Sequence, residues 1–264
     1  MSATPPVLRI DGLTRTFGGL VAVDQVDLAV ADGEIRGLIG PNGSGKSTLL
    51  NLVSGIYRVS AGRIHLAGHD ITRTGPDVRT DRGIARTFQN IRLFTGLSVR
   101  DNVAAACYCR SRSSLLSILA RTPRMRAEER DIQRRTDEAL ELVGVGGRSD
   151  AHPGDLPYGE RRLVEIARAL ATQPRVLLLD EPAAGLNPVE KARLLALIRR
   201  LNQEEGLTLV LVEHDMQVIM NICDRISVLN FGAKIGEGDA DEVRRNPAVI
   251  EAYLGRGDQR AADP

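Results

Sequence analysis

Short apolar runs alternate with polar turns along the first third of the chain, a pattern typical of strands. We expect strands over Leu8–Phe17, Val23–Val30, Glu34–Ile39 and Gly62–Leu66. In the second run, Val26, Leu28 and Val30 alternate with Asp27 and Ala29, which predicts a strand with one buried face. The first third is therefore rich in β-structure.

From Val99 to about Ala171 the spacing of apolar residues becomes helical. Two helical faces are clear in this stretch, and their residues are Ile132, Thr136, Ala139, Leu140 and Val143, then Leu163, Ile166, Ala167 and Leu170. Strand and helix patterns alternate again from Val176 to Asn230. The pattern predicts an α/β core of residues 7–90 and 172–255, interrupted by a helical subdomain at about 91–171. We expect one domain over 7–255 and a flexible polar tail at 256–264.

A glycine-rich segment lies between an expected strand and an expected helix, Lys46–Val53. Its residues are Gly40, Pro41, Asn42, Gly43, Ser44, Gly45, Lys46, Ser47 and Thr48. This spacing in this context is the signature of a phosphate-binding loop, in which main-chain N–H groups point at the phosphates. Lys46 would reach the β- and γ-phosphates, and the Ser47 hydroxyl would bind Mg²⁺.

Two later apolar runs each end in polar side chains. Val176–Leu179 is followed by Asp180 and Glu181, and the run Leu207–Glu213 is followed by His214. Unbroken apolar runs predict strands buried on both faces of a parallel sheet. Their C-terminal ends would face the phosphate site, where Asp180 would orient Mg²⁺ or its waters and Glu181 would accept a proton from water. The alternative is a strand end that acids merely cap.

Composition narrows the class of protein. The chain has 264 residues and a net charge of +1, so charge gives no case for nucleic acid. No apolar stretch approaches the roughly 20 residues that span a bilayer, and the N-terminus has no signal-peptide pattern. We expect membrane contact only through a partner.

The cysteines and two histidines suggest no further chemistry. Cys107, Cys109 and Cys223 imply no disulfide framework. A metal site at Cys107 and Cys109, or at His65 and His69, lacks further ligands nearby in the sequence, so we expect these side chains to be structural.

The order of these motifs, with Gln89 and the segment Leu156–Glu160 between them, resembles the ATP-binding subunit of an ABC transporter over Leu8–Gly255. The resemblance implies a P-loop NTPase core with an antiparallel β subdomain, and ATP and Mg²⁺ as cofactors. It also implies that Gln89 contacts Mg²⁺ or the attacking water and that His214 binds the γ-phosphate. By themselves a glutamine and a histidine after strands would be uninformative. Phe17 matches the aromatic that stacks on adenine, although it could instead be a core residue.

The segment Leu156–Glu160 departs from the family's usual Leu-Ser-Gly-Gly-Gln. The departures are Pro157 for the serine, Tyr158 for the first glycine and Glu160 for the glutamine, whereas Gly159 is kept. In ABC proteins this signature segment binds the ATP of the opposite subunit. Pro157 offers neither a hydroxyl nor an N–H. Asn187 similarly stands where the dimer-contact loop usually has an acid.

A tyrosine in the signature is familiar in the ATPases of branched-chain amino-acid importers, as are the insertion Arg110–Arg135 and the ending Asn246–Gly255. The resemblance therefore implies an ATPase subunit of such an importer at the cytoplasmic face of the cell membrane. Its partners would be a second ATPase subunit, transmembrane permease subunits and, indirectly, an extracytoplasmic solute-binding protein. Import of urea or another polar solute, an exporter role, and an ATPase acting on DNA or ribosomes are the alternatives. The Arg-rich insertion would either contact anionic lipid or a membrane subunit, or form a solvated helical pair.

Overall fold

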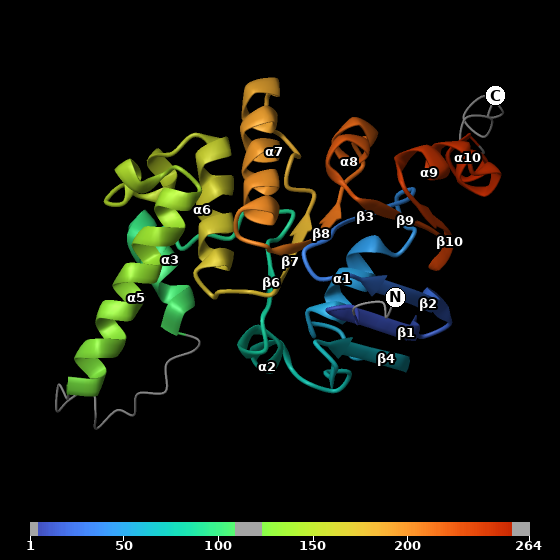
Figure 1. The fold of residues 1–264 in the computed structure, drawn as a ribbon, viewed down its shortest axis with the longest axis horizontal. Helices are drawn as coiled ribbons and strands as arrows, with labels where there is room; N and C mark the ends of the chain where they lie inside the picture. The colour runs from blue at the N-terminus through green and yellow to red at the C-terminus, as the bar shows by residue number, and fades with distance from the viewer. Residues whose placement is uncertain (1–4, 109–122, 255–264) are drawn as a thin grey trace.

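The computed structural model describes residues 5–108 and 123–254 and places two sheets side by side with helices packed around them (Figure 1). The larger sheet has the order β10-β9-β3-β8-β7-β6. Its strands in chain order are β3 (Ile35–Ile39), β6 (Ile84–Arg86), β7 (Val176–Asp180), β8 (Thr208–Val212), β9 (Arg225–Asn230) and β10 (Ala233–Gly238). All its pairings are parallel except that of β9 with β10. This arrangement is the α/β class that the sequence predicts.

The central strands of this sheet are buried on both faces because helices cover both. Every residue of β3, β7 and β8 is buried. Alternate residues of a strand face opposite sides, so Leu177 and Leu179 join one apolar cluster while Val176 and Leu178 join the other. The unbroken apolar runs in the sequence reflect this two-sided burial.

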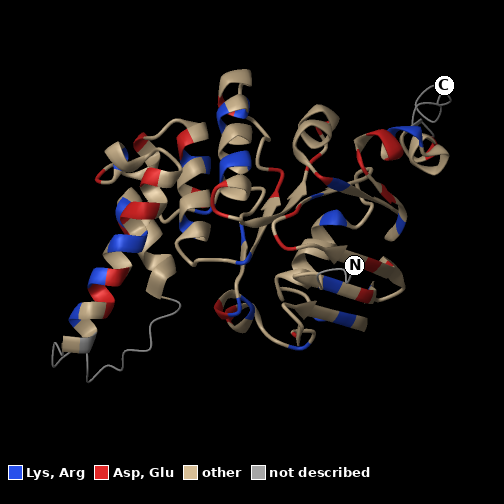
Figure 2. Ribbon diagram, in the orientation of Figure 1, with Lys and Arg blue, Asp and Glu red and all other residues tan. Residues whose placement is uncertain are grey.

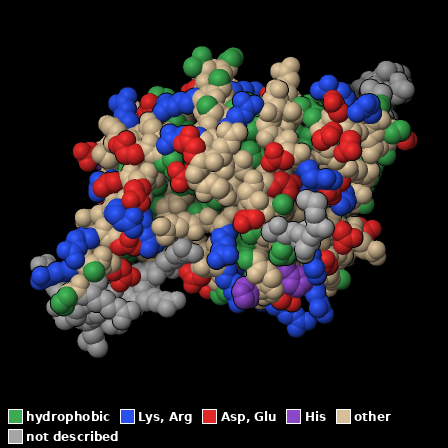
Figure 3. Space-filling view, in the orientation of Figure 1, with side chains coloured by type: hydrophobic (Ala, Val, Ile, Leu, Met, Phe, Trp, Pro, Cys, Tyr) green, Lys and Arg blue, Asp and Glu red, His purple; other side chains and the backbone are tan. Residues whose placement is uncertain are grey.

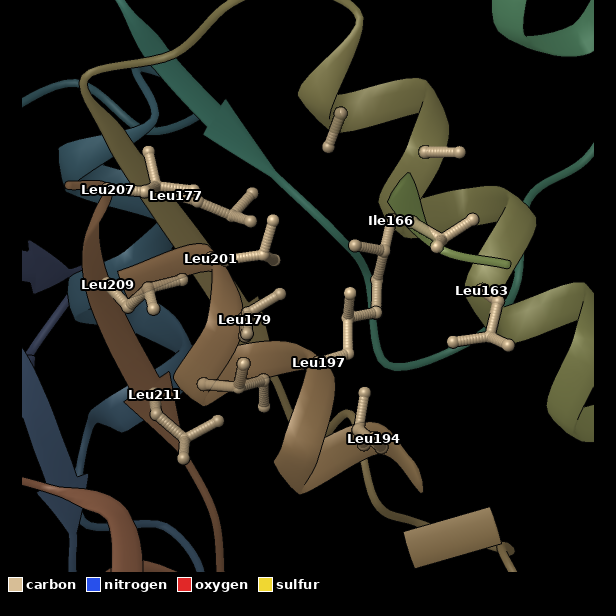
Figure 4. Packing of buried hydrophobic residues seen from close by; sticks show 14 of the residues in the cluster. Leu163, Ile166, Leu177, Leu179, Leu194, Leu197, Leu201, Leu207, Leu209 and Leu211 are labelled. Carbon is tan, nitrogen blue, oxygen red and sulfur yellow. The ribbon is translucent and has the colours of Figure 1, made fainter. Parts of the chain in front are cut away.

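The first cluster holds the sheet against α7 (Pro188–Gln203) and α6 (Tyr158–Leu170). Figure 4 shows the leucines of α7 lying between β7 and β8 on one side and α6 on the other. The labelled side chains are Leu163, Ile166, Leu177, Leu179, Leu194, Leu197, Leu201, Leu207, Leu209 and Leu211. The strands that carry the acids are thus fixed by dense apolar packing.

The second cluster joins the opposite face of the large sheet to α1 (Lys46–Val53) and to a smaller antiparallel sheet. That sheet has the order β2-β1-β4-β5, with bounds β1 (Leu8–Phe17), β2 (Leu20–Val30), β4 (Ala61–Leu66) and β5 (His69–Asp70). β2 begins at Leu20 rather than at Val23, because Phe17 and Leu20 pair across a tight turn. The strand therefore also includes Leu20, Val21 and Ala22, three apolar residues before the predicted start.

Three helices, α3 (Val99–Cys107), α5 (Pro123–Leu142) and α6, pack together beside the large sheet (Figure 1). Short 3-10 turns at Gly146–Arg148 and Pro153–Asp155 lead into α6. The face predicted for the second of these helices is buried as expected, with Ile132, Thr136, Ala139, Leu140 and Val143 all inside. The subdomain boundaries proposed from the sequence stay a prediction.

Basic and acidic residues alternate along α5 (Figure 2). Asp131 pairs with both Arg134 and Arg135 along this helix. Basic and acidic side chains are likewise interspersed over the face shown in Figure 3. The part of the Arg-rich insertion that the structure describes is thus a helix with paired surface charges, whereas residues 110–122 lie outside the described residues.

The remaining helices are α2 (Pro76–Asp81), α8 (Met216–Ile222), α9 (Ala240–Arg245) and α10 (Pro247–Leu254). Within residues 5–108 and 123–254, no helix combines the length and the apolar character needed to cross a membrane. Cys107 is buried, and burial raises the pKa of the Cys223 thiol to about 12. Burial of this kind is typical of structural cysteines, whereas Cys109 and the expected tail at 256–264 lie outside the described residues.

Candidate nucleotide-binding and hydrolysis site

The glycine-rich loop joins β3 to α1 and requires its glycines for two different reasons. Gly40 and Gly45 have φ angles of 149° and 101°, which L-residues with a side chain rarely adopt. A Cβ on Gly40 would lie 2.1 Å from the Leu229 carbonyl oxygen, and one on Gly45 would lie 2.5 Å from that of Ala22. Strand β9 and strand β2 therefore press directly on the loop, and only glycine fits.

The side chain of Lys46 bonds back to the start of the loop. Its Nζ donates to the carbonyl oxygens of Gly40 at 2.7 Å and Pro41 at 3.0 Å, and the residue is buried. Gly45 occupies the N-cap of α1 and supplies no side-chain cap. The first N–H groups of α1 and the ammonium group of Lys46 thus share a small concave surface that suits an anion.

A cleft of about 500 Å³ opens over this loop. Residues 42–48 form one wall, and Phe17, Leu20, Glu181 and Phe231 lie around the rest. Phe17 is part exposed, with the Arg15 guanidinium 4.4 Å from its ring centroid and the Tyr57 ring edge-on at 5.3 Å. The aromatic residue predicted to stack on adenine therefore does line the same cleft as the phosphate loop.

Leu20 and Phe231 add apolar surface to this cleft that the sequence did not suggest. Both are strongly exposed, at 67% and 83%. Neither belongs to a motif, and their only sequence signal is an apolar residue next to a glycine. Gly232, next to Phe231, is tied to the loop because its N–H donates to the Ser44 carbonyl oxygen at 3.0 Å.

Asp180 ends β7 and is buried, with a 5% exposed side chain. Its Oδ2 accepts a hydrogen bond from Arg86 Nη2 at 2.7 Å. Its Oδ1 is also buried and has no hydrogen-bond partner among the described residues. A buried carboxylate oxygen without a partner, with the exposed Ser47 hydroxyl at the start of α1, fits the oxygen ligands that Mg²⁺ prefers.

Glu181, the residue after Asp180, has a strained backbone, and its side chain is hydrogen-bonded. Its φ is 47°, in the left-handed region, and its N–H donates to the Val212 carbonyl oxygen at 2.9 Å. Gln89 Nε2 donates to Glu181 Oε2 at 2.8 Å, and His214 Nδ1 lies 3.9 Å from the same oxygen. The structure thus brings together three residues that lie up to 125 positions apart in the sequence (214 minus 89). Backbone strain at a carboxylate that faces a cleft is typical of functional sites.

Glu213 is a site residue that the sequence analysis missed. It is 1% exposed, its Oε1 accepts a hydrogen bond from the Ala183 N–H at 2.8 Å, and its Oε2 lies 4.0 Å from His214 Nδ1. Burial raises the pKa of the Glu213 carboxyl group, and the charge on Glu181 raises it further. Glu213 therefore fixes the turn that follows Glu181. An acid at the end of an apolar strand was the available signal.

The signature segment opens α6 but does not line the cleft over the phosphate loop of its own chain. Pro157 is the N-cap of α6 and provides no side-chain cap. Tyr158 lies against Gly185, where a Cβ would be 3.2 Å from Tyr158 Cε1. Gly159 lies against Glu190, and Glu160 is 3.4 Å from Arg148 Nε. Tyr158 and Gly159 therefore lie beside Gly185 and Glu190, near the start of α7, and none of the four residues lines the cleft over the phosphate loop.

Asn187 is used within its own chain. Its Oδ1 accepts a hydrogen bond from the Glu190 N–H at 3.0 Å, and its own N–H donates to Glu190 Oε2 at 3.0 Å. This is a capping box at the start of α7. Asn187 has the same shape as an aspartate. It uses that shape here to cap the start of α7 at the end of the loop.

A buried ion pair on α6 holds the Gln89 segment, and the sequence analysis also missed it. Arg162 Nη1 donates to the Phe88 carbonyl oxygen at 2.6 Å, and Nη2 donates to that of Gln89 at 2.7 Å. Glu165 accepts a hydrogen bond from Arg162 at 2.7 Å and another from the Phe88 N–H at 3.3 Å. Both side chains are at most 1% exposed. Charged residues inside a mainly apolar helical face were the signal.

Sequence comparisons agree with this geometry. The family described as ABC transporter matches residues 23–184, and the family described as branched-chain amino acid ATP-binding cassette transporter matches residues 233–259. The chain is 42% identical over 250 residues to the high-affinity branched-chain amino acid transport ATP-binding protein BraF of Pseudomonas aeruginosa. That match covers 95% of this chain and 98% of the relative.

Solved structures agree as well. The fold is similar to a crystal structure of the ADP conformation of an ATP-binding cassette of an ABC transporter, with a TM-score of 0.83 and 32% identity. The similarity covers 96% of this chain and all of the other. A dimeric structure of a post-hydrolysis state of another ATP-binding cassette, bound to ADP and Pi, has a TM-score of 0.73 and 26% identity over 88% of this chain and 98% of that one.

Proposed function

The chain belongs to the ABC transporter family of ATP-binding proteins, and from this premise we propose that it drives the import of branched-chain amino acids. The family assignment confirms the resemblance inferred from the motif order, and with it the P-loop ABC ATPase fold and ATP hydrolysis. The observation that carries the substrate class is the match to a branched-chain amino-acid transport ATPase over nearly the full length of both chains. The comparisons do not favour import of urea or another polar solute, an exporter role or a role on DNA or ribosomes.

We propose the following roles for the site residues, which come from the family resemblance and are supported by the contacts described above. Phe17 stacks on adenine with the ring face that Arg15 leaves open, and residues 40–48 with Lys46 bind the phosphates. Ser47, Asp180 and Gln89 hold Mg²⁺, which when bound neutralises charge on the transferred phosphoryl group. Glu181 accepts a proton from the attacking water, while Gln89 and His214 orient its carboxylate.

We propose further that hydrolysis takes place at an interface between two ATPase subunits. The signature residues Pro157, Tyr158, Gly159 and Glu160 lie away from the chain's own nucleotide cleft, which suits action on the ATP of a second subunit. A related cassette is dimeric after hydrolysis. Because Pro157 has no N–H, the anion contact falls to the N–H groups that begin α6 and to the helix dipole.

The remaining partners follow from the same proposal. Transmembrane permease subunits contact this ATPase at the cytoplasmic face of the membrane, and an extracytoplasmic solute-binding protein delivers the solute to them. The Gln89 segment, held by Arg162, transmits movement of the helical region to the active site. Residues 7–90 and 172–255 act as the catalytic core and residues 91–171 as the helical arm.

Co-purification and reconstitution test this function. The chain is expressed with an affinity tag in its own cell, and the membrane proteins that co-purify with it are reconstituted into vesicles with ATP at the ATPase side. We expect uptake of leucine, isoleucine or valine, abolished when the chain carries Glu181→Gln. Uptake of urea with no branched-chain uptake would overturn the solute class. Recovery of the chain without any membrane protein would overturn the importer role.

A further inference from the structure

Arg86, the last residue of β6, lies on the same side of the sheet as the metal-binding carboxylate. β6 pairs in parallel with β7, and Arg86 stands opposite Leu178. Because side chains alternate along a strand, Arg86, Leu178 and Asp180 leave the sheet on one face. Leu178 belongs to the apolar cluster that contains the leucines of α1. The register therefore puts the Arg86 guanidinium between α1 and the end of β7.

The guanidinium is fixed there by three polar partners. Nη2 donates to Asp180 Oδ2 at 2.7 Å, while Nη1 donates to Asn51 Oδ1 at 2.6 Å and to Ser54 Oγ at 3.2 Å. The side chain is 7% exposed, and its charge lies 5.2 Å from the centre of the Phe88 ring. A buried planar guanidinium with several partners has little freedom to reorient. Arg86 thus ties the helix that follows the phosphate loop to the carboxylate of Asp180.

We propose that Arg86 is a positioning residue of the metal site. By holding Oδ2 it leaves Oδ1, which is buried and has no partner among the described residues, presented for Mg²⁺ or for a water of its shell. This inference rests on the proposed role of Asp180 and adds a residue that the phosphate-loop and strand-end motifs do not contain. Partners that orient a ligand in this way typically change metal affinity or activity about 10–100-fold when they are removed.

Arg86 also links the position of the Asp180 carboxylate to the position of the Gln89 segment. Arg86 stands three positions before Gln89, and the Thr87 N–H between them donates to the Leu178 carbonyl oxygen at 3.0 Å. Asp180 and Gln89 are therefore held by one short stretch of chain. A displacement of this stretch moves both groups together.

Arg86 could either orient Asp180 or act only as a nearby cation. The two roles predict opposite changes in metal affinity when Arg86 is removed. If Arg86 acted only as a nearby cation, it would repel a divalent ion, and its removal would tighten metal binding. If it orients Asp180, its removal weakens metal binding because a buried carboxylate loses its fixed direction. The sign of the change in metal affinity therefore distinguishes these two roles.

The experiment measures Mn²⁺ binding to the full chain by electron paramagnetic resonance with saturating ADP, and ADP binding separately in EDTA. For Arg86→Met we expect Mn²⁺ affinity to fall about 10–100-fold, with a smaller loss for Arg86→Lys and for Asn51→Ala. ADP affinity in EDTA should stay within about twofold. Arg82→Met is the matched control, because Arg82 is an exposed arginine whose guanidinium group bonds only the Asp70 carbonyl oxygen among the described residues.

Unchanged or tighter Mn²⁺ binding in folded Arg86→Met would overturn the inference. If Arg86→Met does not fold, the Mn²⁺ affinities of Arg86→Lys and Asn51→Ala test the inference instead. Wild-type affinity in both variants would overturn the inference. Asp180→Asn separates this inference from the proposed function. If Asp180→Asn weakens Mn²⁺ binding and the Arg86 variants do not, only the role of Arg86 is wrong. If Asp180→Asn has no effect, the proposed metal site itself is wrong and the inference falls with it.

Discussion

The nucleotide cleft and the signature segment, the two proposed functional regions of this chain, are held in place by different physical means. The cleft is shaped by local backbone geometry, with glycines where β2 and β9 press on the loop and a strained Glu181 at the end of a buried strand. The signature segment instead opens α6, the helix whose buried Arg162 and Glu165 side chains bond to Phe88 and Gln89.

This difference has a consequence for how the regions respond to change. A loop defined by its own glycines and by buried strand ends keeps its shape when a distant helix moves. The helix that carries the signature segment is bonded through Arg162 to the carbonyl oxygens of Phe88 and Gln89, so a movement of α6 would move these residues with it. We infer that nucleotide binding belongs mainly to the first region and its coupling to partners mainly to the second.

The largest effect should come from the cleft. Glu181→Gln keeps the shape of the side chain but cannot accept a proton, so ATP turnover in the whole complex should fall about 10²–10⁴-fold. ATP binding should persist, because Lys46, Ser47 and Asp180 are unchanged. Steady-state phosphate release measures the turnover, and light scattering with ATP should show an accumulated dimer. Turnover at the wild-type rate would show that another group is the base.

Lys46→Ala tests binding rather than chemistry in the same region. The variant removes a buried ammonium group aimed at the loop, and a hydrogen bond to a charged group contributes about 1.5–3 kcal/mol, so ATP should bind roughly 10–100-fold more weakly. Isothermal titration calorimetry measures this affinity. Lys234→Ala, at a half-buried lysine paired with Glu237, serves as the control and should leave the affinity unchanged. Normal affinity in Lys46→Ala would place the nucleotide elsewhere.

Arg162→Met tests the support of the signature region. It leaves Glu165 buried without its partner, which should cost about 3–5 kcal/mol of folding stability. Replacing both with Arg162→Met and Glu165→Met should restore much of that stability, because apolar residues often substitute well for a buried ion pair. Thermal unfolding measures this recovery.

The same double variant separates stability from positioning. Turnover should stay about tenfold below wild type, because misplacement of a supporting segment by about 1 Å can cost up to 10²-fold and the contacts to Phe88 and Gln89 are gone. Full recovery of turnover with stability would mean that the pair only stabilises the fold.

Gln89→Ala should give the smallest change in binding and sharpens the contrast between the two regions. The variant removes the hydrogen bond to Glu181 but leaves the phosphate loop intact. ATP affinity should therefore stay within about twofold, a smaller change in binding free energy than the loss of one net hydrogen bond would give. Transport per ATP hydrolysed should fall in reconstituted vesicles. An unchanged ratio of transport to hydrolysis would argue against a coupling role for Gln89.

Local sequence patterns determined most of the fold and the first half of the site. The spacing of residues 40–48 required a particular loop, and the unbroken apolar runs before Asp180 and Glu213 required strands buried on both faces. Each of these is a property of a few consecutive residues, so a single sequence is enough to predict it. The resemblance of the motif order then identified the family.

Only the tertiary structure determined which distant groups meet. Arg86 could be assigned to Asp180 only when the register of β6 against β7 was known, since a shift of one residue would turn Arg86 to the other face. Arg162 and Glu165 looked like ordinary charges on a helix until α6 was seen to bury them against Phe88 and Gln89. Glu213 was likewise hidden, because its role depends on a turn thirty positions away. Local pattern fixes which elements form, whereas strand register and helix packing decide which side chains share a buried, low-dielectric site and so interact strongly.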